Sequence, residues 1–389
     1  MTKKFQGVDY YSLDDLLSEE EKMVRETVRQ FVTDKVLPRV AEHGRAGTFP
    51  AELVTEMGEL GLLGANLKGY GCAGLGNVAY GLILQELERG DSGVRSCASV
   101  QGALVMYPIH QFGSEAQKEK WLPRLSSGEA IGCFGLTEPD FGSNPAGLLT
   151  KAEKKDGGWV INGRKRWITN GSMAHVAVVW ARTDEGIRGF LVEKDRPGFS
   201  AKEIEGKLSL RMSDTSDLLF EDCAIPEENI LPETSGLKSA LKCLNQARFG
   251  IAWGAVGAAM ACYDEAVEYA KTRIQFDKPI ASFQLVQRKL VGMLTEITKA
   301  QLLCLQVGRL KEQGKARAQQ ISMAKRNNVY HALEIARTAR DILGASGIVD
   351  EYQCMRHMVN LESVKTYEGT HDIHTLIIGQ DITGISAFE

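Results

Sequence analysis

The carboxylate of Glu368 stands where it could act as a general base. It lies between Tyr367 and Gly369 in the segment K-T-Y-E-G-T-H-D-I-H, residues 365–374. Gly369 lets the backbone turn where a larger residue would be strained. A carboxylate on a tight turn at the start of a helix can be held partly out of water, and desolvation raises its pKa, which suits a base. The simpler interpretation is an ordinary solvated glutamate ahead of a capped terminal helix.

The residues after this turn predict that helix. Thr370 has a side chain suited to an N-cap, and Asp372 falls in the first turn, where a negative charge is favourable. Ile373, Leu376 and Ile377 share one face at helical spacing. The candidate base therefore sits just before a helix near the end of the chain.

A second candidate, Arg95, could bind an anion. It belongs to a dense run of charges in E-L-E-R-G-D-S-G-V-R-S, residues 86–96. A guanidinium presents its donors as a planar fork that matches a carboxylate. In that interpretation Glu88 and Ser99 orient Arg95 toward a substrate carboxylate. The simpler interpretation is a solvated helix end.

A third stretch, Trp167-Ile168-Thr169, follows N-G-R-K-R and has two interpretations. It predicts a strand with an inward tryptophan, or an aromatic ring and a hydroxyl that pack on a flat heterocycle. The stretch G-Y-G-C-A-G, residues 69–74, matches a dinucleotide pattern, but it follows a helical segment rather than a strand, so we treat the match as false.

The sequence contains no motif for a metal site or for a nucleophilic catalytic triad. The histidines lack ligand spacing; His371 and His374 could share a face, yet a satisfied or solvated pair is the simpler interpretation. The sequence has no G-x-S-x-G elbow and no P-loop. We therefore expect no metal site.

Composition excludes several classes of protein. The chain has 389 residues, of which 43% are hydrophobic and 25% charged, as in a soluble globular protein of two or three domains. A net charge of −4 gives no electrostatic footprint for nucleic acid and no basic stretch for a membrane surface. The eight cysteines form no C-x-x-C pair and predict reduced core residues. The first ten residues contain no apolar signal region, so we expect a cytoplasmic protein or a processed mitochondrial matrix protein.

The elements that position these candidates fall into three blocks. Residues 1–17 predict an arm, and Ser18 with Glu21 forms a capping box for a helix that Pro38 ends or bends. Further helices are expected at 52–63, 78–88 and about 114–126. Short β-rich runs separated by Gly, Asp, Asn and Pro follow from Ile131 to about Pro226 and predict an antiparallel sheet or small barrel. Long helical patterns then cover 238–272, 282–313, 316–343, 353–363 and 371–386, which predict a bundle.

The predicted fold class is therefore α+β and mainly α. Its expected parts are an N-terminal helical domain (1–130), a middle antiparallel β domain (131–234) and a C-terminal helical bundle (235–389). The candidate base lies in the last part and the candidate anion clamp in the first.

Ten stretches in the same order resemble the acyl-CoA dehydrogenase family, and within it the enzymes that oxidise and decarboxylate glutaryl-CoA. They are M-G-E-L-G-L-L-G (57–64), K-G-Y-G-C-A-G (68–74), A-Y-G-L-I-L-Q-E-L-E-R (79–89), G-C-F-G-L-T-E-P (132–139), W-I-T-N (167–170), G-K-L-S-L-R (206–211), A-R-F-G-I-A-W-G (247–254), M-L-T-E-I-T (293–298), A-K-R-N-N (324–328) and T-Y-E-G-T-H-D-I-H (366–374). The family's order of helical, β and helical domains agrees with the order predicted from the residues.

The resemblance implies a non-covalent FAD between the β domain and the C-terminal helices, with part of the site from a neighbouring subunit of a homotetramer. The implied cofactor residues are Phe134, Leu136, Thr137, Gly142, Ser143, Trp167, Ile168, Thr169, Arg273, Phe276, Gln284, Asp341, Leu343, Gly344, Ala345, Thr370 and Asp372. Of these, Arg273 and Gln284 would reach the FAD of the partner subunit.

The resemblance also implies a catalytic role for Glu368. It would take the α-proton of an acyl-CoA while a hydride leaves the β-carbon for the flavin. Some relatives carry the base just before the helix arginine, but that position is Ala247 here. The implied substrate-binding residues are Glu88, Arg95, Ser96, Ser99, Ser143, Thr169, Leu241, Asn245, Arg248, Tyr367, Gly369 and Phe388. Arg95, Thr169 and Tyr367 match the groups that hold the distal carboxylate of glutaryl-CoA, and electron-transfer flavoprotein is the implied electron acceptor.

Two alternatives stay open at this point. One is a non-decarboxylating enzyme, or one for another short acyl-CoA; the other is a catalytically silent acyl-CoA-binding scaffold. The sequence also departs from the family pattern at Asn144, at Asp277 and at Gln380-Asp381. The departures at Asp277 and at Gln380-Asp381 put FAD affinity and subunit contacts in doubt, while none of them touches the proposed base or clamp.

Overall fold

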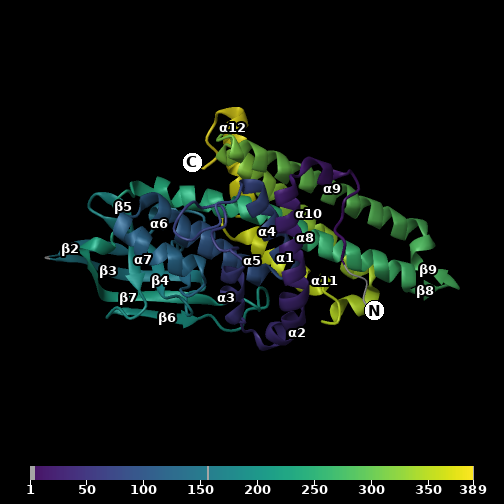
Figure 1. Ribbon diagram of the computed structural model, residues 1–389, viewed down its shortest axis with the longest axis horizontal. Coiled ribbons are helices and arrows are strands. Elements are labelled where there is room, and N and C mark those ends of the chain that lie inside the picture. Colours follow the sequence, from purple (N-terminus) through teal and green to yellow (C-terminus); the bar gives the residue numbers. More distant parts are fainter. Residues whose placement is uncertain (1–4, 156, 389) are drawn as a thin grey trace.

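The first block of the chain is helical, as expected. A computed structural model describes residues 5–155 and 157–388 (Figure 1). Its N-terminal helices are α1 (Glu19–Phe31), α2 (Leu37–Ala46), α3 (Glu52–Glu59), α4 (Asn77–Gly90), α5 (Ser92–Ser99), α6 (Tyr107–Phe112) and α7 (Glu115–Ser126). Ser18 and Glu21 form the predicted capping box. Pro38 falls in the first turn of α2 after a π-helical segment, Val32–Val36, so the chain bends there without losing its helical course.

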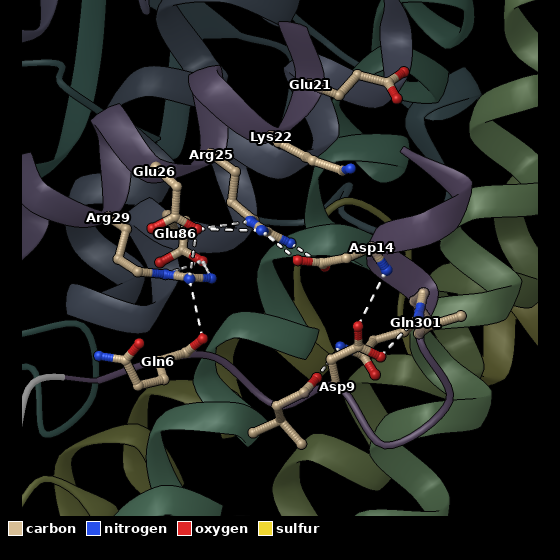
Figure 2. Close-up of polar contacts among 12 residues, drawn as sticks. Gln6, Asp9, Asp14, Glu21, Lys22, Arg25, Glu26, Arg29, Glu86 and Gln301 are labelled. Atoms are coloured by element: carbon tan, nitrogen blue, oxygen red, sulfur yellow. Dashed lines mark hydrogen bonds and ion pairs between the residues drawn. The ribbon is translucent and has the colours of Figure 1, made fainter. Parts of the chain in front are cut away.

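The N-terminal arm lies across α1 and α4 rather than in solvent; its first four residues are outside the described part. Arg25 Nη2 donates to Asp14 Oδ2 at 2.8 Å, and Arg29 Nη1 donates to the carbonyl of Gln6 at 3.3 Å (Figure 2). Arg29 also binds Glu86 of α4, with 2.8 Å between Nη2 and Oε1. This arm is therefore tied to the helical domain by buried and half-buried charges.

The middle block is a sheet whose main path runs β1-β4-β2-β3-β7-β6, with β5 paired to β4. Its strands are β1 (Gly132–Gly135), β2 (Lys151–Lys155), β3 (Gly158–Thr169), β4 (Val176–Thr183), β5 (Gly186–Glu193), β6 (Phe199–Glu203) and β7 (Thr215–Pro226). The pairings are antiparallel except those that β1 and β2 make with β4. Two irregularities interrupt the register of β3 against β7, and the second, between Lys165 and Ile168, contains Trp167.

The C-terminal block is the predicted bundle. Its helices are α8 (Gly236–Thr272), α9 (Gln284–Glu312), α10 (Ala318–Ile342), α11 (Cys354–Thr366) and α12 (His371–Thr383), and a short hairpin, β8 (Ile274–Gln275) with β9 (Lys278–Pro279), links α8 to α9. The long helix α8 packs against both α4 and α10. Figure 1 places the sheet and the β8–β9 hairpin at opposite ends of the long axis of the molecule.

One of the described helices, α9, is long and apolar enough to cross a membrane by length and composition, which was not expected from the sequence. Its most apolar window has a mean hydropathy of 1.2, and 39% of that window is buried inside the protein. A packed core helix of a soluble protein has the same properties, so α9 alone is weak support for a membrane span.

Specific polar contacts join the three blocks near the candidate residues. Gln101, just after α5, accepts from the backbone N–H of Gly132 in β1 at 2.8 Å. On the other side, Asn360 of α11 accepts from the backbone N–H of Leu210 at 2.8 Å, and Ser209 donates to the carbonyl of Val359 at 2.6 Å. These contacts fix α5 and α11 relative to the sheet.

Candidate active site

The turn that carries Glu368 has an unusual backbone. It joins α11 to α12, and Thr370 caps α12 as predicted, because its Oγ1 accepts from the N–H of Ile373 at 3.1 Å. Gly369 has a φ of 96°, but Glu368 itself has a φ of 52°, in the left-handed region that side chains other than glycine rarely adopt. A non-glycine residue persists there only when its surroundings impose the conformation.

The Glu368 side chain is not solvated. The residue as a whole is half-buried, yet its Oε2 is buried and has no hydrogen-bond partner among the described residues. Burial raises the pKa of Glu368, and the positive charges of Arg95, Lys325 and Arg248 oppose that rise. The interpretation as an ordinary solvated glutamate is therefore wrong, and a buried carboxylate with a raised pKa is a candidate base.

Arg95 is fully buried, so the interpretation as a solvated helix end is also wrong. Its Nε donates to Glu88 Oε2 at 2.6 Å, and its Nη2 donates to the hydroxyl of Tyr367, the residue before Glu368. Ser92 Oγ donates to the other oxygen of Glu88 at 2.8 Å. Glu88 therefore orients Arg95 as predicted. Ser99 does not, since its buried hydroxyl has no partner in the described part of the chain.

A close helix contact explains how this pair becomes buried. At Gly254 of α8, an added Cβ would lie 1.9 Å from Glu88 Oε2 and 3.2 Å from Arg95 Nε. Only glycine permits that approach, so the W-G-A-V-G run of α8 packs directly over the ion pair.

One further unpaired group lies with these charged residues. The hydroxyl of Tyr80 on α4 is buried without a partner in the described residues, and the charges of Arg95 and Glu368 both act on it. Tyr80 could not be identified from the sequence. Nearly all residues of α4 are buried, so the helix has no polar face from which the position of Tyr80 could be recognised. Native proteins rarely leave buried polar groups unsatisfied, so this concentration of unpaired atoms indicates a polar ligand site.

Trp167 faces outward, which excludes the inward tryptophan. Its side chain is 55% exposed, and its φ is 64°. The backbone N–H of Arg166 donates to the carbonyl of Thr137 at 2.9 Å, so the loop after β1 lies beside the end of β3. The loop that the resemblance assigns to the cofactor and the stretch 167–169 are thus brought together, with Ile168 buried and Thr169 half-buried.

The other residues implied for cofactor or substrate fall in three settings. Phe134 and Leu136 are buried beneath the loop that carries exposed Gly142 and Ser143, and Asp372 is exposed near the base. Ser96 contacts the Tyr367 hydroxyl at 3.3 Å, Arg248 contacts the carbonyl of Glu368, and Asn245 is half-buried on the same helix as Arg248. Leu241 and Phe388 are exposed and lie outside the buried cluster.

A further group lies at the far end of the bundle, around the β8–β9 hairpin. Arg273, Phe276, Gln284, Asp341, Gly344 and Ala345 are all exposed. Leu343 differs from them, since its side chain is 2% exposed in the core, so a role toward a cofactor stays a prediction for its backbone rather than its side chain. In the described part of the chain, no cluster of His, Cys, Asp and Glu could hold a metal ion, and all eight cysteines are free.

The helices, sheet and bundle follow one another in the order of an acyl-thioester oxidoreductase, and the turn between α11 and α12 carries a glutamate whose Oε2 is buried. Residues 18–129, 133–223 and 234–383 match the N-terminal, middle and C-terminal domain models of acyl-CoA dehydrogenase. The chain belongs to the acyl-CoA dehydrogenase family.

Individual members of the family are similar to this chain over nearly its whole length. The crystal structure of glutaryl-CoA dehydrogenase from Mycobacterium smegmatis is 56% identical, with a TM-score of 0.96 over 97% of this chain and 98% of that chain. A second glutaryl-CoA dehydrogenase structure from that organism, in complex with FADH2, is 52% identical, with a TM-score of 0.97 over 98% and 99%. The mitochondrial short-chain specific acyl-CoA dehydrogenase of Rattus norvegicus is 38% identical over 369 residues, 93% of this chain and 90% of that protein.

Proposed function

We propose that this protein is an FAD-dependent dehydrogenase that converts glutaryl-CoA to crotonyl-CoA and CO2. The observation that carries the proposal is the buried Arg95 next to the base. Arg95 has five N–H donors, and its hydrogen bonds to Glu88 and Tyr367 use two of them. Donors are therefore left for a carboxylate, which plain fatty acyl chains lack and glutaryl-CoA has at its far end.

The residues present fit FAD. The exposed indole of Trp167 and the half-buried Thr169 offer a flat apolar face with a hydroxyl beside it. Gly142 has open space around it, which lets a bound group approach the backbone of the loop that Thr137 begins. These residues and the neighbouring backbone would hold the flavin, and FAD, when bound, supplies the two-electron oxidant that accepts a hydride from the substrate β-carbon.

The chain's own residues account for the proton chemistry. Glu368 takes the α-proton, and its backbone N–H offers a donor for the charge that develops on the thioester oxygen. After oxidation the γ-carboxylate leaves as CO2, and its electron pair delocalises into a dienolate. The proton held by Glu368 then returns to the γ-carbon and gives crotonyl-CoA. Arg95 keeps the carboxylate in place during the first step.

The proposed electron acceptor is electron-transfer flavoprotein. Trp167 supports this, since its exposed ring lies next to the proposed flavin segment and provides a surface where a redox partner can approach. We further propose a homotetramer, because part of the implied cofactor set is exposed around the β8–β9 hairpin, where the side chains of Ile274 and Phe276 are exposed too. We also propose that the domains divide after residues 130 and 234. The proposed location is a bacterial cytoplasm or a mitochondrial matrix.

A second candidate is a dehydrogenase for another short acyl-CoA or one that does not decarboxylate, and similarity to the rat short-chain enzyme favours it. The test is product analysis with glutaryl-CoA and an artificial electron acceptor, beside butyryl-CoA. Release of CO2 with crotonyl-CoA supports the proposal. Accumulation of glutaconyl-CoA, or turnover of butyryl-CoA alone, would overturn it.

A further inference from the structure

We infer that Lys325 is a positioning residue for the base: it holds the backbone carbonyls on both sides of Glu368 and so fixes where that carboxylate lies. The inference rests on the proposed function only in taking Glu368 as the base. The hydrogen bonds of Lys325 go to the turn and not to the carboxylate, so it acts by holding the turn and, at longer range, by its charge.

The contacts are made from the middle of α10. Lys325 is 1% exposed, and its Nζ donates to the carbonyl of Tyr367 at 3.0 Å and to that of Gly369 at 2.8 Å. Arg248 Nε donates to the carbonyl between them, that of Glu368, at 2.8 Å. Two buried cations thus bind three consecutive carbonyls of one turn.

The turn needs such support because its backbone is strained. Glu368 and Gly369 both have positive φ, and a positive φ at a glutamate is unfavourable unless the surroundings impose it. The space behind the turn is also tight, since an added Cβ at Gly369 would lie 2.8 Å from His374 Nε2. Release of the flanking carbonyls would let Glu368 relax toward a common conformation and move its carboxylate.

Lys325 also contributes charge. The ionisable groups that act on Glu368 or on Lys325 come from every helix around the turn. They are Tyr80 and Glu88 of α4, Arg95 of α5, Arg248 of α8, Lys325 of α10, Tyr367 at the end of α11, and His371 and His374 of α12. Burial lowers the pKa of Lys325 to about 7. A neutral amine still has two N–H donors, so both carbonyls stay bound above that pH while the positive charge fades.

A simpler account is that Lys325 is one more buried lysine of the bundle. Lys311 of α9 provides the comparison, because burial lowers its pKa to about 8 and its Nζ donates to Gln246 Oε1 at 2.6 Å. Lys311 makes no contact with the turn among its hydrogen bonds. The variants Lys325→Met and Lys311→Met therefore remove the same group from a buried place that holds the base and from a half-buried place that does not.

The experiment uses purified holoenzyme and whichever acyl-CoA the wild type oxidises, so it does not depend on decarboxylation. We expect Lys325→Met to lower kcat by about a hundredfold, as displacement of a catalytic group does, with KM changed less than about threefold. Loss of a nearby positive charge should also move the acid limb of kcat/KM up by about one pH unit. Lys325→Arg should keep that limb in place, and Lys311→Met should leave kcat and the limb at wild-type values.

A second measurement needs no turnover. Infrared spectra across pH report the protonated carboxyl of Glu368, assigned by its loss in Glu368→Gln, and its midpoint should rise in Lys325→Met. The inference is overturned if kcat and this midpoint in Lys325→Met match those of Lys311→Met. If Lys325→Met does not fold, Lys325→Gln removes the charge with less loss of volume and is judged by the same two outcomes. Failure of the glutaryl-CoA proposal would show instead in the wild-type products, with the Lys325 effects intact.

Discussion

Glu86 and Glu88 lie two residues apart on α4, both fully buried, and face opposite sides of the helix. Glu86 belongs to a closed cluster, in which the charged groups pair with one another, and Figure 2 shows part of this cluster. Its Oε1 accepts from Arg29 at 2.8 Å and its Oε2 from Arg89 at 2.8 Å. Arg89 also donates to the carbonyl of Arg29 at 2.9 Å and to Thr33 at 3.1 Å. Each charge in this cluster has a partner of opposite sign.

Glu88 belongs to a cluster that is less complete. It binds Arg95 and Ser92, but the nearby Oγ of Ser99, hydroxyl of Tyr80 and Oε2 of Glu368 have no partner among the described residues. Burial alone does not distinguish the two clusters, because both are removed from water. Satisfaction of hydrogen bonds does, and it supports the proposal that the Glu88 side binds the ligand.

The largest expected effect comes from the base. Glu368→Gln should lower turnover by about 10³- to 10⁴-fold, because the amide cannot accept the α-proton. FAD content, measured from the visible absorbance of the purified protein, should be unchanged. A residual rate above about one tenth of the wild type would assign the base elsewhere.

Glu368→Gln should lower activity but raise thermal stability. Since burial raises the pKa of Glu368, the unfolded chain loses this proton at a lower pH than the folded one, and ionisation reduces stability as pH rises through that window. Glu368→Gln should therefore raise Tm at neutral pH. The gain should vanish at a pH below the usual glutamate pKa, and a loss of Tm at neutral pH would contradict the assigned environment.

The closed cluster should respond in stability and not in catalysis. Glu86→Gln removes the carboxylate that buried Arg89 contacts and leaves Arg29 with only the exposed Glu26, and breaking a buried pair costs about 3–5 kcal/mol of unfolding free energy. Urea unfolding followed by circular dichroism measures it. At 25 °C the ratio of glutaryl-CoA to butyryl-CoA turnover should stay at the wild-type value; a change in that ratio would break the distinction between the two clusters.

The incomplete cluster should respond in specificity. The double variant Glu88→Gln/Arg95→Met removes both charges together, which avoids leaving either one buried and unpaired. We expect kcat/KM for glutaryl-CoA to fall about a hundredfold, as expected for a lost charge-assisted contact, while butyryl-CoA turnover changes little. Equal losses for both substrates would show that Arg95 serves the pocket's shape rather than the distal carboxylate.

These contrasts also show which parts the sequence could predict. Local signals predicted where two helices begin, because Ser18 caps α1 and Thr370 caps α12. Helices between 92 and 112 were not predicted, because almost every residue there is buried and no polar face gives the helical period.

The burial of Arg95 could not be predicted from its local sequence. It depends on Gly254, more than a hundred residues away, while the surrounding run of charges is typical of a solvated surface. The sequence contains one indication that Lys325 is buried. Lys325 falls on the apolar face of α10, four residues from Ile321 and four from Val329. A lysine in that phase must find buried acceptors, but the pattern does not say that they belong to residues 367 and 369.

The smallest effects should come from two serines of the incomplete cluster, and their signs should differ. Ser92 Oγ donates to Glu88 at 2.8 Å, so Ser92→Ala removes a hydrogen bond to a buried charge and should lower the unfolding free energy by about 1.5–3 kcal/mol. Ser99 Oγ is buried without a partner in the described residues, so Ser99→Ala removes an unsatisfied group and should leave stability equal or slightly higher. If that hydroxyl also binds the substrate carboxylate, Ser99→Ala raises the KM for glutaryl-CoA about tenfold and leaves the KM for butyryl-CoA unchanged. Parallel losses of stability in the two variants would mean that the protein itself satisfies Ser99, and the case for a ligand on this side of α4 would then rest on Arg95 alone.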